Sequence, residues 1–390
     1  MKVRGRLILD DRIVVGQITL EGDEISSLEL EENDDPGGTL PLISPGFVDV
    51  HVHGGGGHDA MGGATALGGM ARHLLGHGVT SFLPTAVAAP LSALIRFADE
   101  VRGWMAAAAA DEAMRLGAVA LGAEALGAEA LGFNLEGPYL APARRGAHDP
   151  TNLQVPADVS FDALEPLIGG LRLITIAPEL PGALELIGWL RERGVAISMG
   201  HSAANLEQAR AGYAAGGTST THLFNAMSGV DHHAPGLAVT ALADDSAYVE
   251  LIADGEHVHP ALWPLITRSK PADRLMLVSD AISLAGTGDG RARVGGLEVE
   301  VVGQRVTLVG TTTMAGSVIA LDDAVRNLVG SGVSLPVAVA AASRNPLAML
   351  GITDRGRLAV GQRADLVELD DELHVRRVMR AGTWVVGGAD

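Results

Sequence analysis

Two histidines lie one residue apart in the segment FVDVHVHGGGG, where an apolar run ends and four glycines follow. Side chains two positions apart on a strand point to the same face, so His51 and His53 share one side of the chain. Two imidazoles on a buried face are costly to desolvate unless they share a task such as binding a cation. The pair therefore predicts a metal-binding role for both histidines.

Ionisable residues also end other apolar runs of the chain. Glu136 ends LGFNLE, His201 ends VAISMGH, His222 follows STT, and Asp280 ends LMLVSD. If these runs are parallel strands of one barrel, their ends meet at one mouth and the side chains gather in a single site. Because the chain has no cysteine, nitrogen and oxygen atoms must hold the ion. That ligand set suits zinc first, and iron, manganese or cobalt next.

This set of residues has room for one or two divalent ions. The first histidine pair would bind one ion and His201 with His222 the other, with Glu136 close enough to contact both. Asp280 is then the candidate base. A metal lowers the pKa of bound water toward about 7, and a nearby carboxylate can pass the proton to a leaving group. The combination predicts metal-assisted hydrolysis.

The runs that carry these residues belong to a regular alternation along the chain. Short segments rich in Val, Ile and Leu are separated by Ala-rich stretches of helical period, such as TALGGMARHLLGHG and NLEQARAGYAAGG. Continuous apolar strands spaced by helices indicate a parallel sheet covered on both faces, and eight of them predict an α/β fold built on a (β/α)8 TIM-like barrel. The segments are 47–52, 79–84, 131–137, 171–178, 195–201, 219–224, 248–255 and 275–280.

The two ends of the chain have a different pattern. Apolar and polar residues alternate before residue 46, and the alternation returns in RLAVGQRADLVELD and VRRVMRAGTWVVGG. A period of two is typical of half-exposed antiparallel strands. We predict a small β-sandwich domain formed by residues 1–46 and 353–390, with the hydrolase barrel over residues 47–352.

Two low-complexity features receive no catalytic function. Residues 106–132, AAAAADEAMRLGAVALGAEALGAEALG, contain LGAEA twice, and their composition predicts a long exposed helix. The four glycines after His53 are not followed by Gly-Lys-Ser or Gly-Lys-Thr, which argues against a phosphate-binding loop. We expect a flexible loop over the site there.

Charge and composition limit the partners. A formal net charge of -19 would repel nucleic acid and anionic membranes, and an aromatic content of 3% offers no stacking platform for nucleic acid or long glycans. A small-molecule substrate is therefore expected. The N-terminal residues MKVRGRLILDDRIVV lack the apolar core of a secretory signal, which predicts a cytoplasmic protein.

Several segments, in this order, carry a family resemblance: PGFVDVHVHGGGG, NLEGPYL, GHSAA, THLFNAM, DGEHVH and SDAI. They resemble the amidohydrolase superfamily and, within it, the N-acetylglucosamine-6-phosphate deacetylases. The match covers nearly the whole chain and includes the tail NPLAMLGITDRGRLAVGQRADLVELD. The resemblance implies a homodimeric enzyme of amino sugar catabolism. It would hydrolyse the acetamide of N-acetyl-D-glucosamine 6-phosphate to glucosamine 6-phosphate and acetate.

The resemblance also implies roles for individual residues. It places the main catalytic ion on Glu136, His201 and His222, makes Asp280 the acid and base, and assigns a second ion to the first histidine pair. Its substrate contacts fall on His257, on His148 and on the backbone around Asn225 and Ala226. Many amidohydrolases bridge two ions with a carbamylated lysine. The only lysines here, Lys2 and Lys270, end no barrel strand, so a glutamate must serve instead.

The sequence departs from the deacetylase pattern at one site contact. Relatives usually carry an arginine before the PG of NAMSGVDHHAPG, where this chain has His233. Histidine lacks the permanent charge and bidentate fork with which arginine binds phosphate. Compensation could come from His232, Arg144, Arg145 or a neighbouring subunit. Alternatively, the substrate is an unphosphorylated N-acetyl sugar or another N-acyl amine.

Two further points complete the interpretation. Asn134 of FNLEGP replaces a histidine common in relatives, and we interpret it as a tolerated substitution on the inner face of the barrel. A catalytically inactive scaffold with this fold is the alternative from another functional class. It would lack metal ligands, whereas all the candidate ligands and Asp280 are present in this sequence.

Overall fold

The computed structural model describes residues 1–31, 39–117 and 127–386. Within these ranges, eight parallel strands form the central sheet in the order β5-β8-β10-β11-β12-β13-β14-β15. Their bounds are β5 (Phe47–Val52), β8 (Val79–Val87), β10 (Phe133–Glu136), β11 (Leu171–Ile176), β12 (Ala196–Met199), β13 (Ser219–Thr220), β14 (Tyr248–Leu251) and β15 (Leu275–Leu277). Each of the eight apolar segments of the sequence supplies one of these strands.

Backbone hydrogen bonds close the sheet into a barrel at the carboxyl ends of its strands. The Asp280 amide donates to the His51 carbonyl at 2.9 Å, and the His53 amide donates to the Ala281 carbonyl at 2.8 Å. These bonds join the first strand to the chain that follows the last one. The predicted (β/α)8 barrel is confirmed, and its closure lies directly at three of the candidate site residues.

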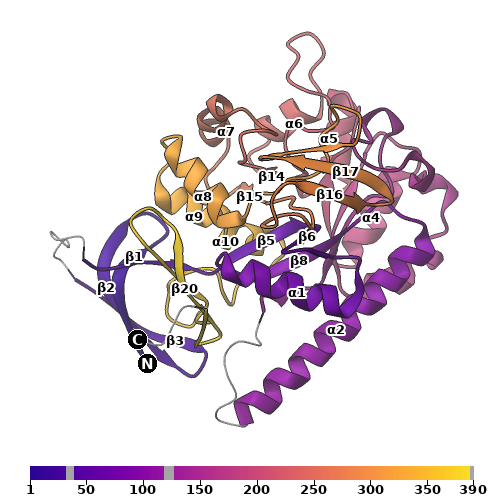
Figure 1. Cartoon of the computed structure of the whole chain (residues 1–390). Helices are drawn as coiled ribbons and strands as arrows, with labels where there is room; N and C mark the ends of the chain where they lie inside the picture. The colour runs from indigo at the N-terminus through magenta and orange to yellow at the C-terminus, as the bar shows by residue number, and fades with distance from the viewer. Residues whose placement is uncertain (32–38, 118–126, 387–390) are drawn as a thin grey trace.

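Helices cover the outside of the barrel (Figure 1). Helix α1 shows why they pack there, because Leu67, Met70, Leu74 and Leu75 recur at helical spacing and are buried on one face. The described helices are α1 (Gly63–Gly76), α2 (Leu91–Gly117), α3 (Glu165–Ile168), α4 (Ala183–Glu192), α5 (Leu206–Ala215), α6 (Leu237–Ala243), α7 (Trp263–Ser269), α8 (Leu321–Gly330), α9 (Leu335–Ala341) and α10 (Arg344–Met349). No helix in the described ranges is both long and apolar enough to span a bilayer.

The helix predicted for residues 106–132 is only partly correct. Helix α2 ends at Gly117, and residues 118–126, with the first LGAEA copy, lie outside the described residues. The second copy is not helical, because β9 (Glu129–Ala130) pairs in parallel with β8. Pairing with Ser81 and Phe82 of β8 therefore outweighs the helical propensity of the repeat.

The chain ends form a second, mostly antiparallel sheet in the order β21-β20-β19-β4-β1-β2-β3. Figure 1 shows the indigo N-terminal strands beside the yellow C-terminal ones, which agrees with the predicted small sandwich. Its core includes Leu7, Ile18, Ile43, Leu366 and Met379. The bounds are β1 (Lys2–Ile8), β2 (Ile13–Glu21), β3 (Glu24–Leu30), β4 (Leu42–Pro45), β19 (Leu366–Leu369), β20 (Val375–Arg380) and β21 (Thr383–Val386). The domain limits at 46/47 and 352/353 stay predictions.

Two small β elements at the mouth were not expected from the sequence. Strands β6 (Gly54–Gly55) and β7 (His58–Asp59) form a hairpin from the glycine-rich segment. A Cβ on Gly54 would lie 2.5 Å from the His58 carbonyl oxygen and 2.6 Å from the Ser283 amide nitrogen. The glycine is therefore explained by the close approach of neighbouring backbone atoms. The flexible loop expected over the site is instead this hairpin.

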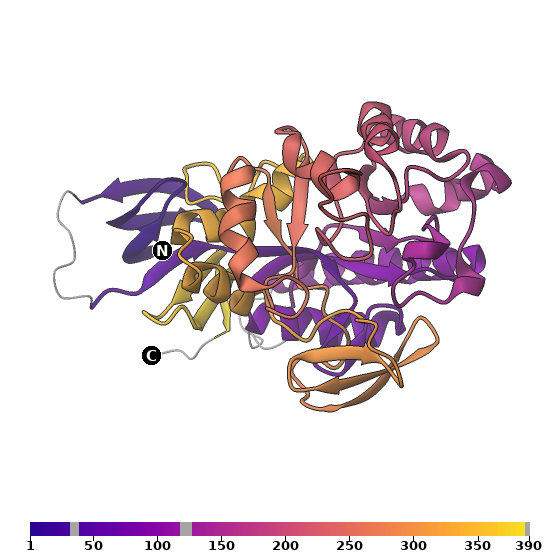
Figure 2. The same ribbon diagram turned by 90° about the horizontal axis from the view of Figure 1, so that it is seen from above.

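The second unexpected element is a three-stranded sheet between β15 and α8. It consists of β16 (Gly290–Val294), β17 (Leu297–Val302) and β18 (Arg305–Leu308) and lies along one side of the molecule in Figure 2. Its apolar face packs Val299 and Val306 into a cluster with Val87 and Ile282 at the barrel mouth. The sheet thus adds a wall beside the site.

Charge pairs link the repeat segment to the chain that leads into β19. The Glu129 carboxylate accepts hydrogen bonds from Arg355, at 2.8 Å, and from Arg363. Burial raises the pKa of Glu129, but the two guanidinium groups outweigh this and hold it below the usual value. Glu129 therefore stabilises the join between the barrel edge and the small sheet.

We expect Glu129→Gln to lower the free energy of unfolding by about 1–2 kcal/mol at pH 7, because two largely buried guanidinium groups lose their anion while solvent screens part of the loss. The pKa of Glu129 is lower in the folded protein than in the unfolded chain, where it is about 4.3. The ionised carboxylate therefore stabilises the fold above that pH, and this stabilisation is lost as the pH falls through the folded-state pKa. The difference in urea unfolding between variant and wild type should therefore vanish in acid. Glu298→Gln, at an exposed pair with Arg293, is the control and should stay within about 0.5 kcal/mol.

Candidate metal centre and active site

The structure brings together the six residues predicted as ligands and acid/base. All lie at or just beyond the carboxyl ends of β5, β10, β12, β13 and β15, and none is more than 6% exposed. Three of them have a left-handed backbone: φ is 46° at His201, 29° at His222 and 50° at Asp280. Such strained conformations for non-glycine residues cluster at functional sites. Here they turn each side chain from a strand end into the mouth.

Glu136 lies at the centre of the group. Its Oε1 is 2.9 Å from His201 Nε2, 3.0 Å from His222 Nε2 and 3.7 Å from His51 Nε2. Its Oε2 is 3.2 Å from the Nε2 atoms of both His53 and His148. One carboxylate therefore contacts both histidine pairs, as a ligand shared by two ions would.

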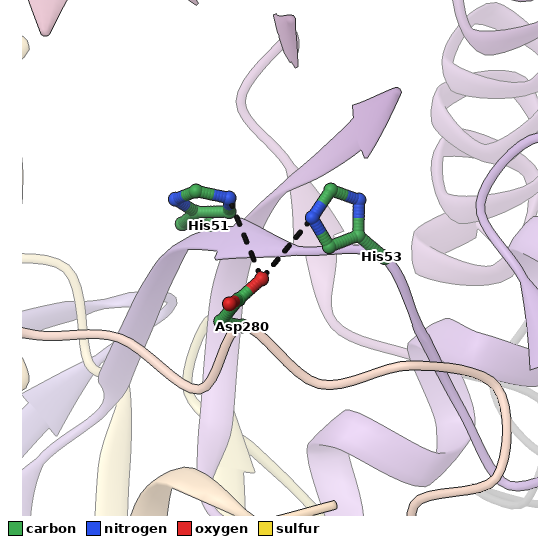
Figure 3. A group of neighbouring side chains, drawn as sticks. All are labelled: His51, His53 and Asp280. Carbon is green, nitrogen blue, oxygen red and sulfur yellow. Dashed lines mark ion pairs between the residues drawn. The ribbon is translucent and has the colours of Figure 1, made fainter. Parts of the chain in front are cut away.

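The Asp280 carboxylate contacts the first histidine pair, His51 and His53. Its Oδ1 lies 3.2 Å from His53 Nε2 and 3.6 Å from His51 Nε2, and Figure 3 shows both rings directed at this oxygen. A ligand atom from each of the three residues lies within 4.8 Å of the others, as does one from each of Glu136, His148 and His201. The candidate base therefore lies beside the space in which His51 and His53 would hold a cation.

The far nitrogens of the histidines show which ring atoms are free to bind a cation. Nδ1 of His51 faces Glu250 Oε2 at 3.0 Å, that of His53 faces the Thr85 carbonyl at 3.1 Å, and that of His201 faces the Arg144 carbonyl at 2.8 Å. Each acceptor places the proton on Nδ1 and leaves Nε2 with its lone pair toward the centre.

The converging Nε2 atoms fit a metal ion. Nε2 of His51 is buried and has no hydrogen-bond partner. His201 and His222 bring their Nε2 atoms to 3.1 Å of each other beside the same carboxylate oxygen. Buried lone pairs directed at one another and at carboxylates are satisfied by a divalent cation, so the residues present suit one.

His148 differs from the other histidines at the centre. The Ala88 amide donates to its Nδ1 at 3.2 Å, so a neutral His148 carries its proton on Nε2. Burial, the largest influence, lowers the pKa of this ring and so favours the neutral form. His148 is therefore arranged as a hydrogen-bond donor into the site and not as a metal ligand.

Charge within the cluster is strongly coupled. Burial raises the pKa of Glu136, but His148, His201 and His222 outweigh it and hold the value well below the usual range. Burial lowers the pKa of His53, whereas Asp280 and Glu136 raise it to about 9. Two buried carboxylates thus draw positive charge to the space among the rings.

A cavity of about 350 Å³ opens at this cluster, and four of the predicted substrate contacts line it: His148, Asn225, Ala226 and His257. His257 Nδ1 lies 2.7 Å from Asp254 Oδ2. Burial lowers the pKa of His257, but this ion pair outweighs it and raises the value. The contact with Asp254 therefore favours the protonated form of a ring that lies on the cavity wall.

The remaining predicted contact, His233, lies elsewhere. It is exposed, packs against His232 with the rings tilted at a centroid distance of 3.9 Å, and is not among the residues that line the cavity. Arg144 does line the cavity, whereas Arg145 donates to the His148 carbonyl at 3.0 Å. Asn134 is buried and donates to Thr85 Oγ1 at 3.3 Å.

A family model described as "Amidohydrolase family" matches residues 42–385. The chain belongs to the amidohydrolase family. Among curated relatives, it is 38% identical to an N-acetylgalactosamine-6-phosphate deacetylase of Escherichia coli O157:H7, over 89% of this chain and 87% of that protein. It is 36% identical to the N-acetylglucosamine-6-phosphate deacetylase of Bos taurus, over 98% of this chain and 92% of that protein.

Solved structures show the same relationship for this amidohydrolase. The N-acetylglucosamine-6-phosphate deacetylase of Thermotoga maritima matches with a TM-score of 0.88 and 30% identity, over 100% of both chains. A mutant N-acetyl-D-glucosamine-6-phosphate deacetylase of Mycobacterium smegmatis, in complex with N-acetyl-D-glucosamine-6-phosphate, matches with a TM-score of 0.85 and 34% identity, over 99% of both chains. The family resemblance recognised in the sequence is confirmed.

Sequence reasoning missed several residues of the amidohydrolase site. Glu250 and Asp254 pair with His51 and His257, and the segment 313–316 lines the cavity. The signal for Glu250 was a carboxylate inside the otherwise apolar run YVELIA. Segment 313–316 carries no comparable signal, because its place depends on the three-stranded sheet beside it.

We expect His148→Asn and His201→Asn to separate a hydrogen-bond donor from a metal ligand. His201→Asn should lower the bound metal measured by elemental analysis, since it removes a lone pair from the centre. His148→Asn should retain the wild-type metal content and lower kcat by about 10- to 100-fold, because it removes or weakens one donor. Loss of metal in His148→Asn would contradict the tautomer that the Ala88 contact indicates.

Proposed function

We propose that this amidohydrolase hydrolyses the acetamide of N-acetyl-D-glucosamine 6-phosphate, giving glucosamine 6-phosphate and acetate. The observation that carries the proposal lies at the floor of the cavity, where Glu136 contacts Nε2 atoms of both histidine pairs and Asp280 contacts those of the first pair. Relatives that match nearly the whole chain carry this activity in their names.

Zinc is our first choice among the divalent ions, with iron, manganese and cobalt as alternatives, because the ligand set has nitrogen and oxygen atoms and no sulfur. Glu136, His201 and His222 would hold one ion, and His51 with His53 a second. When bound, the ion supplies Lewis-acid chemistry, activating water and polarising the amide carbonyl.

The residues of the chain carry the proton. Asp280 takes a proton from the attacking water while the water oxygen bonds to the amide carbon. It then gives this proton to the amide nitrogen as the C–N bond breaks. We assign His148, which lines the cavity and whose Nε2 is 3.2 Å from Glu136 Oε2, as the donor to the oxygen on which charge develops. The second proton of the water ends on the amine or in solvent, so the products are acetate and the amine in its ammonium form, and Asp280 is restored as a carboxylate.

Arg144 and His257 are the groups we assign to the 6-phosphate. Both line the cavity, and Arg144 is exposed at its edge with its backbone carbonyl fixed by His201. A guanidinium and a protonated imidazole can together offset a phosphate dianion. With this assignment, the positive charge for the phosphate comes from residues of the same chain, although His233 does not line the cavity.

A second candidate substrate is an unphosphorylated N-acetyl amino sugar or another N-acyl amine. The replacement of the expected arginine by His233, and its exposed position, favour this alternative. The relative named for N-acetylgalactosamine 6-phosphate makes that phosphorylated epimer a further substrate to compare.

A homodimer and a cytoplasmic location also remain part of the proposal, as do the predicted domain limits.

We expect Asp280→Asn to retain bound metal while kcat for N-acetylglucosamine 6-phosphate falls by about 100- to 10,000-fold, because an amide cannot carry the proton. Elemental analysis and a steady-state assay for released acetate measure the two effects. Activity near that of wild type would remove Asp280 from the mechanism.

We expect Arg144→Ala to raise KM for N-acetylglucosamine 6-phosphate by about 10- to 100-fold, the effect of losing a charged hydrogen bond, and to leave turnover of N-acetylglucosamine unchanged. His233→Ala is the matched comparison, since it removes a basic side chain outside the cavity and should leave both constants unchanged. A KM increase in His233→Ala alone would contradict the assignment to Arg144. Better wild-type turnover of the unphosphorylated sugar would favour the second candidate substrate.

A further inference from the structure

Glu250 is a carboxylate in the barrel interior to which the mechanism gives no task. It lies on β14, and its side chain is 0% exposed. A buried carboxylate is costly unless its charge is compensated. Within the described ranges, its only ion-pair partner is His51, at 3.0 Å. The neutral ring that a metal requires cannot compensate the charge by itself.

The hydrogen bonds of Glu250 connect both histidine pairs. Its Oε2 accepts from His51 Nδ1 and also, at 3.2 Å, from the His222 amide. Its own carbonyl accepts from the Leu223 amide at 2.8 Å. Glu250 thus fixes the ring of one ligand and holds the left-handed backbone that positions another.

A row of hydroxyl groups is oriented toward the same carboxylate. Thr221 Oγ1 donates to Ser198 Oγ at 2.6 Å, and Ser198 Oγ donates to Glu250 Oε1 at 3.4 Å. Because the Thr221 hydrogen is used in this way, Thr175 Oγ1, 2.9 Å from Thr221 Oγ1, must be a donor. All three hydroxyl groups are therefore oriented in one row of donors that ends at the Glu250 carboxylate.

We infer that Glu250 is the positioning residue that makes His51 a metal ligand and so allows the ion position of His51 and His53 to fill. By accepting the Nδ1 proton, the carboxylate leaves the lone pair on Nε2, the atom that is buried without a partner. A cation on that lone pair compensates the charge of Glu250 through the ring, as in other carboxylate–histidine–metal relays. The inference rests on the metal-dependent function proposed above.

Zinc binding to the metal-free full-length protein tests this inference. Titration calorimetry should give two equivalents per chain for wild type. For Glu250→Gln, which keeps an oxygen acceptor but loses the charge, the dissociation constant of one equivalent should rise about 10- to 100-fold while the other changes less. Wild-type protein that binds one ion, or Glu250→Gln with two unchanged constants, would overturn the inference.

A matched control separates this role from the general loss of a buried carboxylate. Asp322 also receives a histidine Nδ1, that of His77 at 3.0 Å, and lies outside the site. Asp322→Asn should leave both zinc constants unchanged. An equal loss of zinc binding in this control would mean that the effect at Glu250 comes from a general disturbance of the fold, and it would overturn the inference.

A double-mutant cycle asks whether Glu250 acts through His51. If it does, Glu250→Gln should add little to the loss already caused by His51→Asn, whereas independent contributions would add. Additive effects would contradict the inference.

If Glu250→Gln does not fold, Ser198→Ala, which removes one donor to the carboxylate, should weaken binding of the same zinc equivalent by a smaller factor. An unchanged dissociation constant would overturn the inference. Two bound ions without deacetylation would contradict the proposed function and leave this inference standing.

Discussion

The site depends on the cost of removing carboxylates from water. Glu136, Asp280 and Glu250 are all buried near the mouth of the barrel, and each faces imidazole nitrogens instead of solvent. Their negative charge must be balanced inside the protein, either by protons on the histidines or by a cation among them. The need for balance explains why so many ring nitrogens point inward, and it makes the group an arrangement for holding positive charge.

The barrel satisfies this constraint through its backbone. Parallel strands deliver their carboxyl ends to one mouth, and the left-handed residues at positions 201, 222 and 280 turn the side chains inward. Closure of the barrel at His51 and Asp280 places the first histidine pair and the candidate base in contact. The hydrogen bonds that close the barrel are made by these site residues themselves, so the closed sheet and this part of the site depend on the same contacts.

Much of this could be predicted from sequence, because the relevant patterns are local. Eight apolar runs marked the eight strands, and an ionisable residue at a run's end marked its place at the mouth. The strand at Glu129 and Ala130 was not predicted, because its pairing with β8 is a long-range interaction that overrides the helical propensity of LGAEA. Glu250 is a central partner of the ligands, yet a single glutamate within a strand has no spacing that pairs it with His51, and only the closed barrel brings β14 and β5 together.

The small sheet β16–β18 has a consequence for how such an enzyme can diversify. It is inserted after Asp280, packs on the mouth through Val87 and Ile282, and precedes the segment that walls the cavity. Because no metal ligand comes from this insertion, its length and turns can vary without disturbing the reacting groups. A change in this sheet can therefore reshape one wall of the cavity while the ligands, Asp280 and the residues assigned to the 6-phosphate keep their places.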